Sequence, residues 1–565
     1  METVHVAVDA ASDLGPLDRI WRSFGYDELN WTYTPGGRAV FKAIGGLGDG
    51  PYWIRNHNAF TSGDTLSREF WGSTNCYTED ERHVPRYDWS VNDRIYDVYL
   101  ENGCKPMIEL DFMPHDLSRF KETGPKESWR YPPRDYGRWR ELNARFARHL
   151  IDRYGKTEVR QWYFSSWNEP DLEYFQSEPG QTPRKESGEQ LAARCAEFCR
   201  LHDHAAAGLR DADGGLRIGG PDLACRTDFL ELFLRHCSEG VNTVDGSRGS
   251  RLDFISLHAK GTGLVDGRVP PPDFDKMVRR EFLRYGAVIG RFAGFRDLPL
   301  VCNEWDIDVG TANGLHHSPD FAYRNGSYYP TFVIRSVKEI LDLKAAGTAN
   351  VGLITQWAFY FEGKRCFEGT RALFDPLGIR KPVFNGFEML SRLGGTRLAL
   401  ASDDTEDDIA VGQCGGNGKA RRTRGDEADG EMTAWDVIKP HRRVDGLAAR
   451  TSGEVQVLVW NQEYDQYAEG VREIGLEVAG LRGWKRATVL HYRIDGRHSN
   501  ASTPWVGMSR PDWPTESQIA AIREREGLEK YCVDRLTDVE GECVSLRFPL
   551  PVHGVSLLIV RKEDR

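Results

Sequence analysis

The sequence predicts an α/β protein, a (β/α)8 TIM barrel with an accessory β-sandwich domain, and three observations lead to this fold class. From about residue 40 to 390, short runs typical of β-strands alternate with amphipathic helical segments. Several of these runs are almost continuously apolar, as strands covered on both faces are. After about residue 395 the helical segments give way to short strands separated by polar turns. A chain of 565 residues also exceeds what one ordinary core supports, which favours an accessory domain.

The barrel prediction depends on strands and helices that follow one another in order. The predicted strands are Phe41–Ile44, Tyr52–Asn56, Pro106–Asp111, Gln161–Trp167, Leu216–Gly219, Leu252–His258, Leu298–Asn303 and Gly352–Phe359. The helices expected between them include Tyr136–Arg153, Gly188–Ala212, Phe282–Phe295 and Tyr328–Ala346. A doubly wound sheet would alternate in the same way, but eight strands over this length favour the closed barrel.

The predicted domain bounds follow from the change in pattern. Residues 11–392 are expected to form the (β/α)8 barrel, and residues 393–565 the β-sandwich domain, which residues 1–10 join as an N-terminal strand. A mobile loop is expected at about 403–431, where Asp, Gly and Arg are frequent, and a helical excursion at about 516–530. The strands predicted for the sandwich are Glu454–Trp460, Ile474–Val478, Arg486–Tyr492, Cys543–Phe548 and Val555–Val560.

Composition excludes several classes of partner. The net charge of −11 argues against nucleic acid, whose phosphates require a basic surface. No apolar run is long enough to span a bilayer, and the N-terminus lacks the pattern of a signal peptide, so a cytoplasmic protein without a membrane partner is expected. The 11 cysteines show no paired spacing and are expected to be free thiols. The sequence leaves the oligomeric state open, a homo-oligomer included.

Two glutamates follow predicted strands in polar motifs. Glu169 lies in Trp-Asn-Glu-Pro-Asp after the fourth predicted strand, and Glu304 lies in Asn-Glu-Trp-Asp after the seventh. Because barrel strands open onto one rim at their carboxyl ends, both side chains should reach the same site. Cleavage of a glycosidic bond requires such a pair of carboxylates. Asn168 is suited to hydrogen-bond a sugar hydroxyl, and we expect burial and the second carboxylate to raise the pKa of Glu169.

Other strand ends supply candidate substrate contacts. His57 follows the second predicted strand and His258 ends the sixth, and both are expected to bind sugar hydroxyls. Trp305 and Trp357 could stack on a pyranose face, and ordinary packing is the alternative for each. Arg55 is expected to hold a carboxylate in place rather than to touch the substrate. No cofactor and no metal is expected.

The motifs resemble those of glycoside hydrolase family 39, which contains β-xylosidases and α-L-iduronidase. The resemblance covers nearly the whole chain and includes the segment 162–171, the segment 93–114 and the C-terminal Met508-Ser-Arg-Pro-Asp-Trp-Pro-Thr-Glu-Ser-Gln. It implies a retaining glycosidase with Glu169 as general acid/base and Glu304 as nucleophile. It also implies a barrel carrying a β-sandwich that is partly built from the N-terminus, in agreement with the elements predicted above.

The two branches of the family compete. The segment 252–261 resembles iduronidase, in which the lysine at the position of Lys260 contacts a substrate carboxylate, whereas xylosidases carry a tyrosine there. Asp306 and Gly310 also stand at iduronidase-like distances after the nucleophile. The segment from Trp357 to Glu362 instead resembles xylosidase. The arginine that iduronidase places on the carboxylate has two candidates in this chain, Arg365 and Arg371.

The expected function is therefore exo-acting hydrolysis of β-D-xylosides or of the stereochemically equivalent α-L-iduronides, with a glycoside as the partner. Two alternatives from other classes remain open at this point. One is a non-catalytic carbohydrate-binding protein on a degenerate barrel. The other is a metal-dependent hydrolase that uses His57 and His115.

Overall fold

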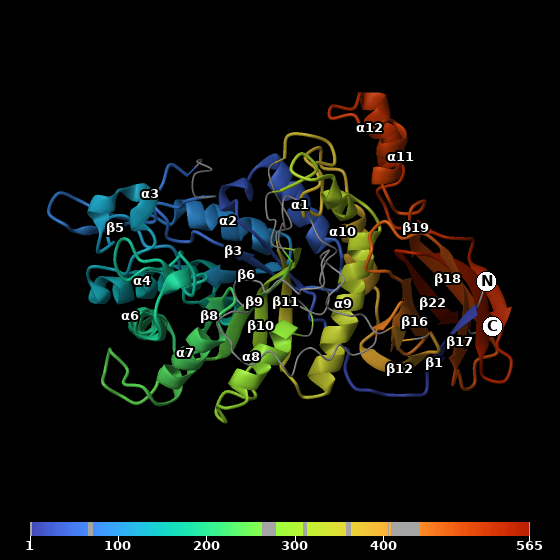
Figure 1. The fold of residues 1–565 in the computed structure, drawn as a ribbon, viewed down its shortest axis with the longest axis horizontal. Helices are drawn as coiled ribbons and strands as arrows, with labels where there is room; N and C mark the ends of the chain where they lie inside the picture. Colours follow the sequence, from blue (N-terminus) through green and yellow to red (C-terminus); the bar gives the residue numbers. More distant parts are fainter. Residues whose placement is uncertain are drawn as a thin grey trace.

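A computed structural model describes residues 3–65, 72–262, 278, 280–308, 313–357, 363–404, 406–407 and 441–563. Within these ranges the chain forms a barrel and a separate curled sheet, which lie side by side in Figure 1. Both predicted parts of the fold are therefore present. Of the loop predicted at about 403–431, residues 405 and 408–431 lie outside the described residues.

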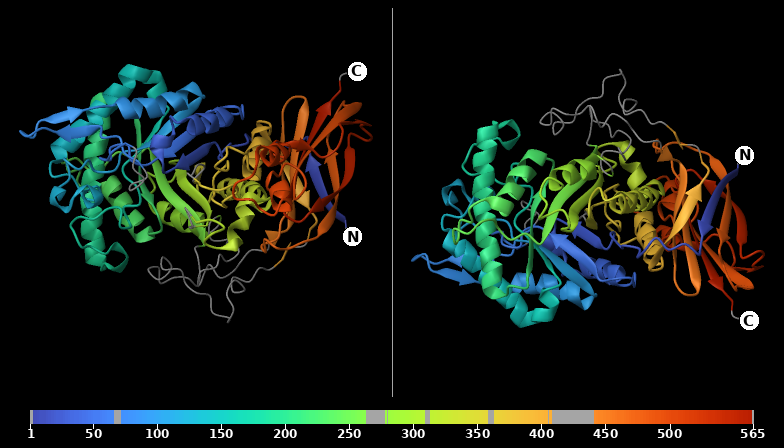
Figure 2. Two further views of the ribbon diagram at one scale, coloured as in Figure 1. Left: turned by 90° about the horizontal axis from the view of Figure 1, so that it is seen from above. Right: turned by 90° about the horizontal axis from the view of Figure 1, so that it is seen from below.

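Eight parallel strands close into the barrel, in the hydrogen-bonded order β10-β11-β2-β3-β6-β7-β8-β9. Figure 2 shows the helices that surround these strands. The strands are β2 (Ser23–Tyr26), β3 (Tyr52–Asn56), β6 (Cys104–Glu109), β7 (Tyr163–Ser165), β8 (Arg217–Leu223), β9 (Phe254–Thr262), β10 (Leu300–Asp308) and β11 (Val351–Trp357). The helices of this part are α1 (Pro35–Gly45), α2 (Ser90–Glu101), α3 (Pro125–Ser128), α4 (Tyr136–Tyr154), α5 (Lys156–Val159), α6 (Gly188–Ala212), α7 (Thr227–Glu239), α8 (Glu281–Ile289), α9 (Tyr328–Ala345) and α10 (Pro382–Ser391). A small hairpin of β4 (Tyr77–Glu79) and β5 (Pro85–Tyr87) extends from the barrel.

The first predicted strand, Phe41–Ile44, is wrong, because these residues belong to α1. Thr34 caps this helix by accepting a hydrogen bond from the backbone N–H of Gly37, and Pro35 occupies its first turn. The buried residues of α1 recur at helical spacing, so the apolar run is the inner face of a helix. The first barrel strand is instead β2, whose four residues are all buried.

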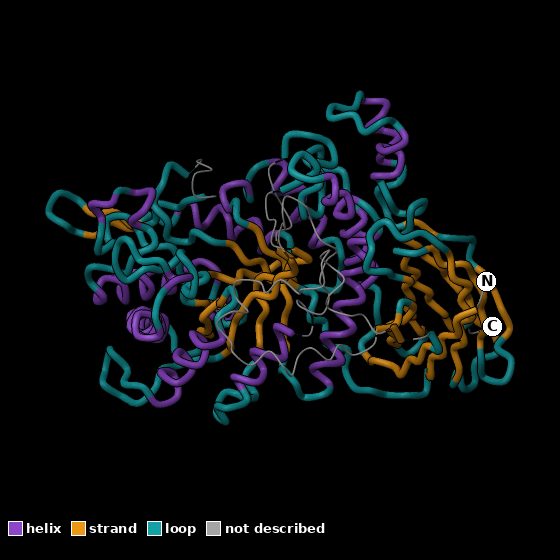
Figure 3. Tube along the Cα trace, in the orientation of Figure 1, coloured by secondary structure: helices purple, strands orange, loops and turns teal. Residues whose placement is uncertain are grey.

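The C-terminal region forms one curled mixed sheet of ten strands, and Figure 3 shows it as a second group of strands beside the barrel. Its continuous path is β19-β18-β22-β16-β15-β12-β1-β17-β21, with β20 paired to β18. The N-terminal β1 (Thr3–Asp9) lies inside this sheet, antiparallel to β12 (Thr396–Ser402) and parallel to β17 (Val471–Ala479). The other strands are β15 (Val444–Arg450), β16 (Glu454–Asn461), β18 (Arg486–Ile494), β19 (Glu529–Lys530), β20 (Arg535–Asp538), β21 (Val544–Pro551) and β22 (Gly554–Lys562). A short pair, β13 (Glu406–Asp407) with β14 (His441–Arg442), lies apart from it, and α11 (Ser502–Gly507) and α12 (Glu516–Arg523) interrupt the sheet between β18 and β19.

Side chains that alternate along the strands pack the curled sheet against the barrel. In β16, Val455, Val457 and Val459 pack in the core enclosed by the sheet itself. The intervening Leu458 and Trp460 instead belong to the core that includes the barrel. Because successive side chains of a strand point to opposite faces, one strand can serve two apolar cores. The β domain is thus packed against the barrel through a continuous apolar interface.

Candidate active site

The carboxyl ends of the barrel strands bring the polar candidates together. On adjacent strands β9 and β10, Glu304 pairs in register with His258, and Asp306 pairs with Lys260. Residues two apart in a strand point to the same face, so these four side chains form a compact block on one side of the rim. The sequence could place them on strand ends, but the register fixes their contacts.

Glu304 is buried and held through both oxygens. Arg55 Nη1 donates a hydrogen bond to Glu304 Oε1 at 2.7 Å, Lys260 Nζ forms an ion pair with Oε2, and His57 Nε2 lies 3.3 Å from Oε1. Burial raises the pKa of Glu304, but the charges of His258, Lys260 and Arg55 outweigh it and hold the pKa well below the usual range. The carboxylate is therefore ionised and fixed in orientation.

Glu169 follows β7 on a backbone with positive φ, at 41°, two residues after Trp167 at 93°. Such a conformation costs a residue other than glycine about 1–3 kcal/mol and persists only where the surroundings enforce it. Here the Glu169 backbone N–H donates to the carbonyl oxygen of Asp222 at 3.0 Å. This turn directs the Glu169 side chain to His258, whose Nδ1 lies 2.8 Å from Glu169 Oε1.

The expectation that the pKa of Glu169 is raised is wrong for the ligand-free protein. Burial does raise it, and Glu304 adds to this effect. The hydrogen bond from His258 and the charges of Lys260 and His258 are stronger together, so the net pKa lies below the usual value. The sequence argument considered the second carboxylate but not the cation that lies beside it.

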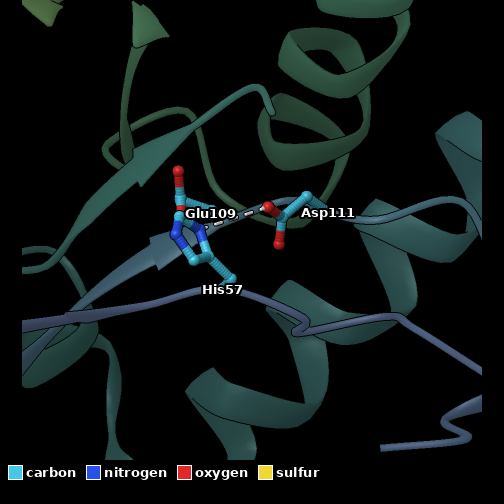
Figure 4. A group of neighbouring side chains, drawn as sticks. All are labelled: His57, Glu109 and Asp111. Atoms are coloured by element: carbon cyan, nitrogen blue, oxygen red, sulfur yellow. Dashed lines mark hydrogen bonds and ion pairs between the residues drawn. The ribbon is translucent and has the colours of Figure 1, made fainter. Parts of the chain in front are cut away.

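A second buried group lies behind Glu304. Figure 4 shows His57, Glu109 and Asp111 together, with His57 Nδ1 2.5 Å from Glu109 Oε2 and 3.9 Å from Asp111 Oδ2. Burial alone would lower the pKa of His57, but Glu109, Asp27 and Glu304 raise it well above its usual value. Burial also raises the pKa of Asp111 to about 6. Because His57 lies within 4 Å of four carboxylates, those of Asp27, Glu109, Asp111 and Glu304, we place the proton of the His57–Glu109 pair on the imidazole.

Arg55 joins the two groups. Its Nη2 forms an ion pair with Glu109 and donates to Asn168 Oδ1 at 2.9 Å, while its Nη1 binds Glu304. Its guanidinium also lies over the Trp357 ring, 4.7 Å from the centroid. These contacts agree with the prediction that Arg55 holds a carboxylate in place.

The two tryptophans differ in their surroundings. Trp357 lines the site, with its ring centroid 4.8 Å from that of His57. A Cβ on Gly25 would lie 2.1 Å from Trp357 Cε3, so β2 needs a glycine where this ring passes. The Trp305 ring instead lies beside Phe332 of α9, with centroids 6.5 Å apart. This position favours packing for Trp305 rather than substrate contact.

The structure also separates the two arginine candidates. Arg371 is fully buried, and its Nη1 forms an ion pair with Asp306 at 2.6 Å. The same carboxylate lies 3.4 Å from Lys260 Nζ, so Asp306 links the two cations. Arg365 is partly exposed and pairs with Asp512 of the β domain instead. The Nε and Nη2 atoms of Arg371 have no hydrogen-bond partner among the residues that the structure describes. Gly310 and Glu362, the remaining predicted site residues, lie outside the described residues.

Two groups of described residues have ligand atoms close enough to consider a metal ion: His57 with Glu109 and Asp111, and His258 with Glu169 and Glu304. Tetrahedral zinc requires ligand atoms about 3.3 Å apart, given metal–ligand distances of about 2.0–2.2 Å. Hydrogen bonds of 2.5 and 2.8 Å already join the histidine to a carboxylate in the two groups, and Arg55 and Lys260 add positive charge. Both groups therefore fit proton-sharing acid–base pairs better than a metal centre. His115 belongs to neither group, and its Nδ1 lies 2.8 Å from Ser128 Oγ.

Sequence reasoning missed buried carboxylates at the rim, among them Asp111 beside His57. Asp27 lies after β2, Glu109 ends β6, and Asp222 lies near the end of β8, where it accepts a hydrogen bond from Ser165 at 2.8 Å. The available signal was an acidic residue at the end of an apolar strand. No helix within the described ranges has the length and apolar character needed to cross a membrane, and every cysteine in them is free.

A closed barrel with paired glutamates on its rim defines the class: the protein is a glycoside hydrolase. The sequence model of glycosyl hydrolases family 39 matches residues 4–542, and the chain belongs to that family. It is 26% identical over 474 residues to a beta-xylosidase of Caldicellulosiruptor saccharolyticus, a match that spans 80% of this chain and 79% of the relative. It is 27% identical over 366 residues to the alpha-L-iduronidase of Homo sapiens, spanning 61% of this chain and 47% of that protein.

A solved structure described as the bacterial orthologue of human α-L-iduronidase shares the fold. Its TM-score is 0.76 at 21% sequence identity, over 100% of this chain and 84% of the other. The near-equal identities to a xylosidase and to an iduronidase leave the choice of substrate to the site itself.

Proposed function

We propose that the protein is a retaining, exo-acting glycosidase with Glu304 as nucleophile and Glu169 as general acid/base. The observation that carries this proposal is the short distance between the two groups. One carboxylate oxygen of Glu169 and one of Glu304 lie within 4.8 Å of one another. Retaining glycosidases have carboxyl groups about 5–5.5 Å apart, whereas inverting enzymes leave about 6.5–9.5 Å for a water molecule.

The proposed reaction has two displacements. A Glu304 oxygen attacks the anomeric carbon while Glu169 donates its proton to the leaving oxygen, which breaks the glycosidic bond. Glu169 then takes a proton from water, the water oxygen attacks the same carbon, and the bond to Glu304 breaks to release the sugar. Arg55 and His57 hold Glu304 in place during both steps.

The low pKa of Glu169 in the ligand-free protein constrains the substrate, because the first step needs Glu169 protonated. Lys260 contributes to this low pKa and pairs directly with Glu304. A substrate carboxylate that draws Lys260 to itself would remove positive charge from both glutamates. The pKa of Glu169 would then rise toward that of a general acid, and Glu304 would become a better nucleophile.

We therefore favour a uronide of the α-L-iduronide type over a neutral β-D-xyloside. Lys260 supplies an ammonium near the nucleophile, and Arg371 supplies the Nε and Nη2 atoms that have no hydrogen-bond partner among the described residues; both suit a carboxylate at C5. The xyloside remains the second candidate, because Glu304 and Asp306 already balance the charge of Lys260 without a ligand.

The roles of the two glutamates are tested with azide and an activated aryl glycoside. Glu304→Ala should lose at least about 10⁴-fold in kcat, and azide should restore turnover by forming a glycosyl azide of inverted configuration. Glu169→Ala should keep much of the first step with a good leaving group, and azide should then give the retained product. The same anomeric configuration from both variants would contradict the assignment, provided that circular dichroism shows both to be folded.

The substrate is tested with a panel of aryl α-L-iduronide, β-D-xyloside, β-D-glucuronide and α-L-arabinopyranoside. We expect the highest kcat/KM with the iduronide. Lys260→Tyr should lower kcat/KM for the iduronide by about 10²-fold or more, the scale of a lost buried charge-assisted contact. It should leave the xyloside value within a few fold, since xylosidases carry tyrosine there. An equal loss with both substrates would indicate that Lys260 serves only Glu304.

A further inference from the structure

The helical excursion of the β domain (residues 495–528) packs on the loop that follows β11 (residues 363–380). In Figure 1, α11 and α12 stand clear of the curled sheet. Their buried side chains, Ala501, Trp505 and Ile522, form one apolar cluster with Cys366, Phe367 and Ile379 of the loop. Trp505 and Phe367 have ring centroids 5.3 Å apart. The excursion is thus a partner of a barrel loop rather than a free projection.

Polar contacts also join the helical excursion to the loop. The Cys366 backbone N–H donates to the carbonyl oxygen of Asp512 at 3.1 Å, and Arg365 Nε lies 3.3 Å from the Asp512 carboxylate. Farther along the loop, Arg523 Nη2 donates to the carbonyl oxygen of Leu377 at 3.0 Å. Two points of the loop, before and after Arg371, are therefore fixed by the β domain.

The barrel holds the loop through three further hydrogen bonds. Asn325 Nδ2 donates to the carbonyl oxygen of Phe367 at 2.8 Å, and Arg324 Nη1 donates to that of Gly369 at 3.0 Å. Lys381 Nζ donates to the carbonyl oxygen of Thr370 at 2.6 Å. The stretch that ends at Arg371 is consequently clamped between the excursion and the barrel.

Arg371 connects the loop with the candidate active site. Its Nη1 binds Asp306 at 2.6 Å and donates to the carbonyl oxygen of Asp308 at 2.8 Å, and Asp306 lies 3.4 Å from Lys260, the partner of Glu304. A continuous series of contacts therefore connects Trp505 in the β domain with the carboxylate that we propose as nucleophile.

We infer that Trp505 and Asp512 are positioning residues for Arg371, so that the β domain helps to form the substrate-binding side of the barrel. This inference rests on the proposed glycosidase function of the site. Trp505 fills the small cluster under the loop, so its loss would leave a cavity there and loosen residues 366–371. The bond-breaking machinery around Glu169 and Arg55 would stay intact. Substrate binding, rather than the chemical step, should then suffer.

The test compares steady-state kinetics of Trp505→Ala, Trp505→Phe and Trp513→Ala on the aryl glycoside that the wild type hydrolyses best. Trp505→Ala should raise KM at least 10-fold and change kcat less than 3-fold, and Trp505→Phe should restore most of the loss. Trp513→Ala is the matched control, because Trp513 lies in the same excursion and is 69% exposed. It should leave both constants unchanged. Asp512→Asn serves as a second, milder variant, with a KM increase of about 3-fold.

A double-mutant cycle identifies the route of the effect. If Trp505 acts through Arg371, adding Trp505→Ala to Arg371→Gln should raise KM less than 2-fold further. If the double variant raises KM by the product of the two single effects, the inference is overturned. A fall in kcat without a change in KM in Trp505→Ala would overturn it as well. Hydrogen–deuterium exchange of residues 366–371 gives a readout independent of turnover, and it should increase in Trp505→Ala but not in the control Trp513→Ala. A wild type without activity on any glycoside would refute the proposed function, whereas an active wild type with unchanged Trp505→Ala kinetics and exchange would refute this inference alone.

Discussion

Asp306 should make the hydrolysis of uronides, but not of neutral glycosides, depend on its own protonation. Its carboxyl is fully buried between Arg371 and Lys260, the two cations that we propose to bind a substrate carboxylate. Burial raises the pKa of Asp306 to about 6, against the lowering effect of the two cations. A substrate carboxylate would compete with ionised Asp306 for both partners. Uronide binding therefore favours the protein in which Asp306 is protonated.

The size of the effect follows from the population of that form. With a pKa of about 6, the protonated fraction is about 0.9 at pH 5 and about 0.09 at pH 7, and apparent affinity scales with this fraction. The kcat/KM for aryl α-L-iduronide should thus fall about 10-fold, relative to that for aryl β-D-xyloside, between these pH values. Taking the ratio of the two substrates cancels the shared ionisations of Glu169 and Glu304.

The assay is the pH dependence of both kcat/KM values in one buffer series at constant ionic strength. Asp306→Asn, which cannot ionise, should give a ratio that does not change with pH. A ratio that stays flat in the wild type, or that rises with pH, would refute the argument that Asp306 competes with the substrate carboxylate.

Three further outcomes are expected from the packing. Arg55→Met should reduce the free energy of unfolding by about 3–5 kcal/mol, measured by denaturant titration, because it leaves buried carboxylates without their cation; an undiminished stability would contradict the buried ion-pair network. Gly25→Ala should fold with a loss of about 1–3 kcal/mol and reduced kcat, because its Cβ would displace Trp357; near-normal kcat would show that the ring position is unimportant. Removal of residues 1–10 should make the β domain unfold at a lower denaturant concentration than the barrel, because β1 lies between β12 and β17. Its buried Val4, Val6 and Val8 each contribute about 1.5–3 kcal/mol of hydrophobic stabilisation, and an unchanged unfolding transition would contradict this role.

The barrel could be predicted from the sequence because its strands are buried on both faces and therefore appear as apolar runs. The error at Phe41–Ile44 has the same origin, since a short apolar run also fits the inner face of a helix. Pro35 and the capping Thr34 before it carried the helix signal. The four-residue β2 was missed because Ser23 and Gly25 break its apolar pattern.

The site could be predicted where a polar motif lies on a strand, because the alternation of side chains along the strand then shows which residues share a face. Spacing of two predicts that Glu304 and Asp306 share a face, and the same rule turns Trp305 away from them, a signal that the sequence interpretation did not use. The contact of Lys260 with Glu304 depends on the register between β9 and β10, which a single sequence does not specify. The choice of Arg371 over Arg365 depends on how a loop folds against the β domain, and this also lies beyond local pattern.

Lys260 is a cation that can move between Glu304 and a substrate carboxylate in the reaction that we propose. As the shared counter-ion of Glu304 and Asp306, it lowers the pKa of Glu304 and stabilises it as a carboxylate, which also makes that carboxylate a better leaving group from a glycosyl-enzyme. A uronide that attracts Lys260 would strengthen the nucleophile in the first displacement. Once the sugar is attached, Glu304 no longer carries the charge that held Lys260, so the cation is free to stay with the substrate carboxylate. For a neutral sugar no such exchange exists, and Lys260 would instead slow the first displacement and favour the second.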